Sequence, residues 1–152
     1  MVWLHRALAA IAVALTVAGS ALAFDLSDAV HVDETTQLPA KAHPRESYIR
    51  YYVSAEVRTV DDLPFTSMRA DFELNPGRFI VGMLVLPGEF GVLGAPGVRV
   101  VQSIADLPYA VHGGCRAVNI LVDQDGHTVG SWCNVDQDEP PPPRRQPLPP
   151  SF

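Results

Sequence analysis

A two-residue alternation of apolar and polar side chains is the clearest pattern in the chain. It runs from Ile49 to Arg58, and its apolar positions are Ile49, Tyr51, Val53, Ala55 and Val57. Successive side chains of a β-strand point to opposite faces, so this period of two is typical of a half-buried strand. The pattern predicts a strand over 49–58.

Further apolar segments are separated by residues that favour turns. Asn75-Pro76-Gly77 and Asp123–Gly126 each interrupt an apolar run, and both favour a tight turn between two strands. With 49–58, these segments predict six strands, the other five being 72–74, 79–86, 98–101, 118–122 and 127–133.

A short pattern occurs twice. Thr59–Phe65 and Ser103–Tyr109 each begin with a hydroxyl residue, carry an acid three positions later, and continue into Leu-Pro. That spacing is typical of a capped helical turn. We therefore expect one-turn helices near 59–64 and 103–108, and both duplication and coincidence remain open as the origin of the repeat.

These elements predict a mainly β fold over 46–136: one small antiparallel sheet, sandwich or partly open barrel of about six strands. Residues 24–45 are rich in acids and contain two prolines, and are expected to form an irregular leader. The alternative is an α+β fold, in which a helix over 26–37 packs on the sheet.

The two ends of the chain have different compositions. Arg6 precedes a run of about a dozen apolar residues, shorter than the ~20 needed to cross a bilayer, and the run ends in Gly19–Ala23. This layout predicts a signal peptide over 1–23, a mature chain that begins at Phe24, and a periplasmic or secreted location. The last residues, 137–152, are rich in proline and are expected to form a disordered tail.

The charge balance narrows the choice of partners. The net charge is −6, and no cluster of basic residues is larger than Arg144-Arg145. An acidic surface repels nucleic acid and anionic lipid, so we expect neither as a partner. No apolar run of the mature chain reaches membrane-spanning length, and the expected partner is an unidentified protein of the envelope or the extracellular space.

The two cysteines, Cys115 and Cys133, lie on the predicted hairpin around Asp123–Gly126. If Val122 faces Thr128 across the hairpin, both sulfurs lie on one face, about 7 Å apart by their Cα atoms. A bulge at Gly113-Gly114 would close that gap. An exported domain meets an oxidising compartment, so the sequence predicts a disulfide between them.

A second interpretation makes the cysteines zinc ligands. His112, Cys115, His127 and Cys133 have the residue types of a zinc site. However, His127 and Cys133 would lie ~20 Å apart along a strand, too far for one ion.

A third interpretation makes Cys115 a nucleophile with His112 as its base, so that the chain would be an enzyme. Such an enzyme needs a reduced thiol, and Cys133 competes for that sulfur.

Other candidate chemistry is weak. Asp123–Gly126 resembles part of a calcium loop but lacks its closing Glu, and no motif for a phosphate or dinucleotide is present, so no cofactor is expected. Tyr48, Tyr52 and Trp132 could form a binding surface, although Tyr48 and Tyr52 would serve equally as packing on the second face of the sheet.

Taken together, these features favour a small exported protein without catalytic activity, which binds a partner and is stabilised by a disulfide. The alternative function is a small cysteine- or metal-dependent enzyme centred on His112 and Cys115. The sequence does not identify the ligand.

Overall fold

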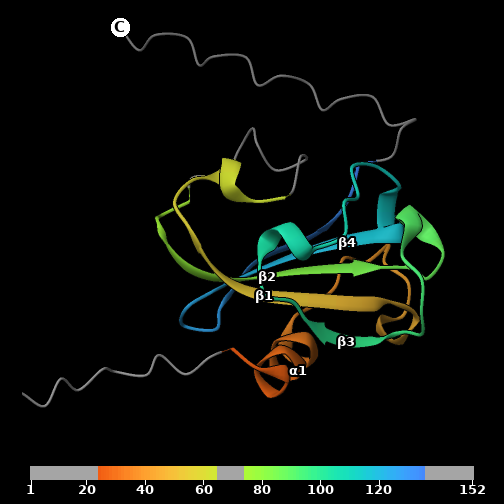
Figure 1. Cartoon of the computed structure of the whole chain (residues 1–152), viewed down its shortest axis with the longest axis horizontal. Helices are drawn as coiled ribbons and strands as arrows, with labels where there is room; N and C mark the ends of the chain where they lie inside the picture. Colours follow the sequence, from red (N-terminus) through yellow and green to blue (C-terminus); the bar gives the residue numbers. More distant parts are fainter. Residues whose placement is uncertain (1–23, 65–73, 136–152) are drawn as a thin grey trace, which may run out of the picture.

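The computed structural model describes residues 24–64 and 74–135, which form one five-stranded mixed sheet with one α-helix and several 3-10 turns (Figure 1). The fold is mainly β, as predicted, and its single helix also agrees with the α+β alternative. The elements are α1 (Leu26–Thr35), β1 (Ile49–Val57), β2 (Gly77–Val85), β3 (Gly97–Val100), β4 (Ala117–Asp123) and β5 (Thr128–Cys133).

The strands lie in the order β3-β1-β2-β4-β5, and within the described residues the sheet is open rather than closed into a barrel. Five strands are present there instead of six, because the predicted strand over 72–74 falls mostly outside these residues. The predicted signal peptide over 1–23 and the tail over 137–152 also lie outside them.

One strand pair corrects the antiparallel prediction. β1 is antiparallel to β2 but parallel to β3, and its first residue, Ile49, pairs with both Val85 and Gly97. The connection that follows β2 therefore passes the start of β1 and enters the sheet on its other side. β3 then runs in the direction of β1 because both strands start at the same end of the sheet.

Residues 24–45 are part of the folded unit instead of an irregular leader. The Asp25 carboxylate accepts hydrogen bonds from the N–H groups of Ser27 and Asp28, and the Asp28 side chain accepts one from the N–H of Asp25. This capping box fixes the start of α1. Ala29 and Val32 face the sheet and are buried. No helix of the described ranges, 24–64 and 74–135, has both the length and the apolar character to span a membrane.

The sheet is covered on both faces. We call the side that packs against α1 the helix face, and the side covered by the connections 58–64, 86–96 and 101–116 the loop face. The core of the helix face is Ala29, Val32, Tyr48, Tyr52, Leu84, Val118, Ile120 and Val122. The core of the loop face is Val53, Val57, Leu63, Phe79, Val81, Met83, Val85, Leu107, Ala110, Ala117 and Leu121. Burial on both faces explains the nearly continuous apolar runs of β2 and β4.

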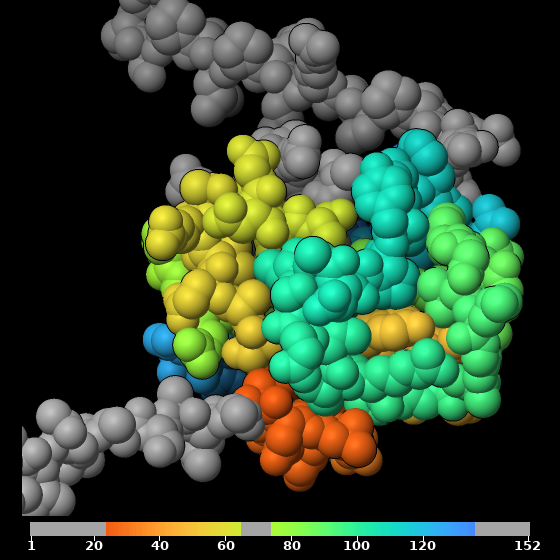
Figure 2. All heavy atoms as spheres, in the orientation of Figure 1, coloured from red at the N-terminus to blue at the C-terminus, as the bar shows by residue number. Residues whose placement is uncertain are grey.

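The two predicted one-turn helices are present on the loop face. They are η2 (Val60–Asp62) and η5 (Ile104–Asp106), and each starts with a capping box, between Thr59 and Asp62 and between Ser103 and Asp106. The leucine that ends each turn, Leu63 or Leu107, is buried in the loop-face core. In Figure 2 the connections drawn in green and teal cover much of this face, and a strip of gold atoms from β1 stays visible between them.

Candidate functional site

The predicted disulfide between Cys115 and Cys133 is present, with its Cα atoms 4.5 Å apart. The predicted pair of Val122 and Thr128 also forms, but the extra residue of the hairpin is Val129, so Cys133 pairs with Val118. The chain before β4 turns through positive φ angles at Gly113 and Gly114 into a short 3-10 turn, which carries Cys115 over the end of β5.

The disulfide bears directly on the two enzyme interpretations. With both sulfurs in one bond, neither is a thiolate that could attack a substrate or bind zinc. His112 is exposed. Its loop is held through the backbone, because the carbonyl of His112 accepts a hydrogen bond of 3.2 Å from Nδ2 of Asn134. His127 lies at the opposite end of β5 from Cys133, and its Nδ1 is 3.4 Å from the Asp123 carboxylate. The structure therefore does not bring His112, Cys115, His127 and Cys133 together as one metal site.

The aromatic residues considered as a binding surface separate into two groups. Tyr48 and Tyr52 are fully buried on the helix face, so they pack in the core and present no surface to a partner. The Tyr48 hydroxyl donates a 2.6 Å hydrogen bond to the carbonyl of Cys115. Trp132 is half-buried and lies beside the disulfide on β5.

A buried cluster of charges on the helix face was not anticipated from the sequence. Asp33, on α1, is 4% exposed. Its carboxylate accepts a 2.7 Å hydrogen bond from the Tyr52 hydroxyl and lies 3.3 Å from an Arg45 nitrogen and 3.5 Å from an Arg50 nitrogen. Burial, followed by the charge of Asp33, raises the pKa of Tyr52 far above its ordinary value, so that this phenol keeps its proton. The cluster fastens α1 to β1.

The sequence does carry one signal for this cluster. Asp33 lies one residue after Val32 and four after Ala29, and these three are the buried positions of α1. An acid on the apolar stripe of a helix needs a buried partner, and two arginines occur shortly afterwards, at positions 45 and 50.

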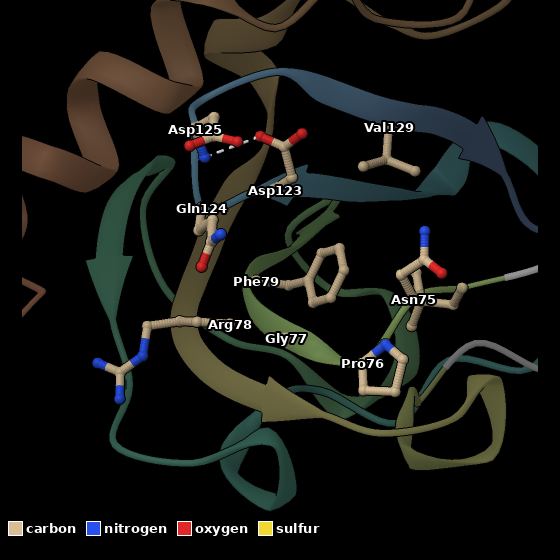
Figure 3. A pocket seen from close by; sticks show the side chains of 10 residues that line it. Asn75, Pro76, Gly77, Arg78, Phe79, Asp123, Gln124, Asp125 and Val129 are labelled. Carbon is tan, nitrogen blue, oxygen red and sulfur yellow. Dashed lines mark hydrogen bonds between the residues drawn. The ribbon is translucent and has the colours of Figure 1, made fainter.

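A pocket of about 380 Å³ lies at the end of the sheet where β4 turns into β5 (Figure 3). We call it the turn pocket. The Phe79 ring points into it between Val129 on one side and Asn75 and Pro76 on the other, while Arg78 points away (Figure 3). The hairpin turn over 123–125 forms another part of its wall.

Three side chains of that turn are close enough to hold one ion. Carboxylate oxygens of Asp123 and Asp125 and a ring nitrogen of His127 lie within 4.8 Å of one another. The Asp123 carboxylate already accepts hydrogen bonds from the N–H of His127 at 2.8 Å and of Asp125 at 3.0 Å. These bonds hold the pKa of Asp123 below its ordinary range, and the bond from the N–H of His127 has the largest effect. These hydrogen bonds close the turn of the hairpin, and this explains why the three side chains lie close together.

A second hollow, also of about 380 Å³, follows β5 near the disulfide. We call it the edge groove. It touches the last three residues of β5, Ser131–Cys133, and the two residues that follow them, so it runs along the edge of the strand and past its end. Pro39–Lys41 form its opposite wall, and Gly114 and Cys115 form its end. Among the described residues that line it, Lys41 is the only charged one, and it is the only lysine of the chain.

No family model matches this chain, and no curated protein or solved structure is significantly similar to it.

Proposed function

We propose that this chain is a small exported protein without catalytic activity, which works in the periplasm or outside the cell as a disulfide-stabilised binding module. The observation that carries the proposal is the Cys115–Cys133 bond. It uses both cysteines of the chain, and a structural disulfide belongs to an oxidising compartment. The predicted signal peptide over 1–23 supports the same location.

The surface chemistry supports binding over catalysis. In the described residues, the nucleophile candidate Cys115 has no free thiol, and the exposed His112 ring accepts and donates no hydrogen bond that would orient it. An acid–base pair needs such an orienting contact. The acidic net charge of −6 directs the proposal to a protein partner of the envelope or the extracellular space and away from nucleic acid.

Thiol counting tests this function against the cysteine-enzyme alternative. Protein purified without reductant is unfolded and treated with a maleimide, with and without prior reduction. We expect no labelled cysteine without reduction and two after it. A cysteine that is labelled without prior reduction would contradict the proposal and make His112→Ala the next variant to assay for lost activity.

Export has its own measurement. N-terminal sequencing of protein from the periplasm or medium should find Phe24 as the first residue, because the apolar run ends at the small residues 19–23. Full-length protein that begins at Met1 and stays in the cytoplasm would contradict the export part of the proposal.

A further inference from the structure

The outer edge of β5 carries backbone hydrogen-bonding groups that no other part of the described chain uses. The N–H of Asn134 donates to the carbonyl of Ala117, so these two residues form a hydrogen-bonded pair of the antiparallel ladder. Such pairs alternate with non-bonded pairs, and the residues of a non-bonded pair point their N–H and C=O groups away from each other. Counting back from Asn134 along the register, Cys133 and Ser131 belong to non-bonded pairs. Their backbone N–H and C=O groups therefore point away from β4.

Within residues 24–64 and 74–135, no other segment takes up the backbone groups of Ser131 and Cys133. The Ser131 side chain donates a 2.6 Å hydrogen bond to the carbonyl of Gln37. Gln37 lies shortly before the groove wall Pro39–Lys41 in the sequence, so this bond holds that wall in place. β5 therefore presents an ordered but unpaired edge.

The other edge of the sheet is different. β3 has four residues, and α1 packs beside it (Figure 1). Short, covered edges are a common protection against pairing with other chains. β5 has six residues and is the longer of the two edge strands, and the edge groove lies beside it.

Charge narrows the choice of occupant. Lys41 is exposed and makes no ion pair with any described residue, and no carboxylate is found among the described residues that line the edge groove. In a chain of net charge −6, this is a locally positive site that favours an acidic side chain. The half-buried Trp132 adds apolar surface in the same groove.

From this geometry we propose that the edge of β5 binds an extended segment of a partner protein, which adds to the sheet as a sixth strand and places an acidic side chain beside Lys41. The proposal rests on the binding function proposed above and specifies its surface. In strand addition the main-chain hydrogen bonds supply the affinity, and the side-chain contacts supply the preference among partners.

The probe is a fluorescein-labelled peptide of seven residues that alternates valine and threonine around a central glutamate. A matched peptide carries lysine at the centre. Fluorescence polarisation with the full chain should show tighter binding of the glutamate peptide. Because an ion pair at an exposed surface contributes only weakly to binding, we expect a preference of about threefold. Lys41→Glu should reverse this preference, whereas Arg58→Glu, at an exposed cation outside the groove, should leave it unchanged.

Two substitutions at one position test the backbone contact. Ser131→Ala and Ser131→Pro both remove the hydroxyl that bonds to Gln37, but only the proline also removes the outward N–H. We expect Ser131→Pro to weaken peptide binding by about tenfold relative to Ser131→Ala, in line with the loss of one hydrogen bond. Melting temperatures confirm that each variant is folded, and if Ser131→Pro does not fold, a peptide N-methylated at alternate positions replaces it.

Two outcomes would overturn the proposal. The first is that both peptides bind equally well and that Lys41→Glu changes neither affinity. The second is that the chain forms a dimer and that Ser131→Pro abolishes it, because the edge of β5 would then bind a second copy of the chain. Failure of the binding function looks different: it would appear as a reactive thiol in the maleimide assay. Because thiol labelling does not depend on the peptide, the two failures are distinguishable.

Discussion

The two faces of the sheet are closed by different means. The helix face is covered by α1, which is fastened by the buried carboxylate of Asp33 and the two arginines beside it. The loop face is covered by connections, which are fastened by neutral amides: Asn134 accepts a 2.7 Å hydrogen bond from Asn119 and donates one of 2.8 Å to the carbonyl of Ala110.

This difference predicts how each face responds to damage. A buried charge that loses its partners is costly because it has neither water nor a counter-ion, whereas a lost neutral hydrogen bond costs less. The helix face should therefore depend on complete charge pairing. The loop face shares its fastening among amides, two capped turns and the disulfide, so the loss of one contact leaves the others in place.

The largest effect is expected on the helix face. Asp33→Ala leaves Arg45, Arg50 and the Tyr52 hydroxyl without their shared acceptor. We expect it to lower the free energy of unfolding by about 3–5 kcal/mol, the typical cost of removing one partner of a buried ion pair. Urea unfolding measures the change, with Glu34→Ala, the exposed neighbour on α1, as the control. A loss of less than about 1 kcal/mol, the level of a surface ion pair, would show that water reaches the arginines.

The disulfide ranks next because it joins the two faces. Cys133 packs against the helix-face core, and Cys115 belongs to the connection over the loop face. Cys133→Ser should destabilise the protein by about 2–5 kcal/mol, and reductant should reproduce the loss in the parent chain. Because one bond is lost either way, Cys115→Ser with Cys133→Ser should cost about as much as Cys133→Ser alone. An additive double variant would be evidence against the bond.

Local sequence signals predicted the elements well. The capped turns followed from a hydroxyl residue three positions before an acid, a signal contained in four residues. The first strand followed from its alternation, and the disulfide from the hairpin spacing and the expected compartment. In each case the partners are close in sequence or lie on one hairpin.

Interactions between distant segments were not predictable in the same way. The parallel pairing of β3 with β1 depends on where the connection 86–96 re-enters the sheet, which no short pattern specifies. α1 has a narrow buried stripe of which Asp33 is one of three members, so its periodicity is weak and the acid resembled a solvated residue. The bulge at Val129 likewise depends on how the hairpin packs against the core.

A smaller effect is expected on the loop face. Asn134→Ala removes the acceptor of Asn119 and the donor to the carbonyl groups of Ala110 and His112. We expect a loss of about 1–3 kcal/mol, the cost of leaving buried polar groups unsatisfied. Hydrogen exchange should accelerate around residues 110–113 while α1 keeps its protection, and Asn75→Ala, at an exposed asparagine, is the control. Equal acceleration in α1 would mean that the faces do not behave independently.

The smallest effect concerns two exposed carboxylates, and it appears as a pH dependence. Asp62 accepts hydrogen bonds from the N–H groups of Arg58 and Thr59, that of Arg58 having the larger effect, and these hold its pKa below the ordinary value. The pKa of Asp123 is lowered in the hairpin turn by the N–H of His127. A carboxyl whose folded-state pKa is depressed binds fewer protons in the folded chain than in the unfolded one.

The stabilisation from Asp62 and Asp123 is therefore fully present above the unfolded pKa near 4 and is lost as the pH falls through the lower folded pKa. Asp62→Asn with Asp123→Asn should be less stable than the parent at pH 6, and the difference should narrow towards pH 3, because the parent then protonates the same two groups. Urea midpoints measured across that range test this expectation. A difference that stays constant from pH 6 to pH 3 would mean that the two side chains act through shape alone, and that their charges do not stabilise the two turns.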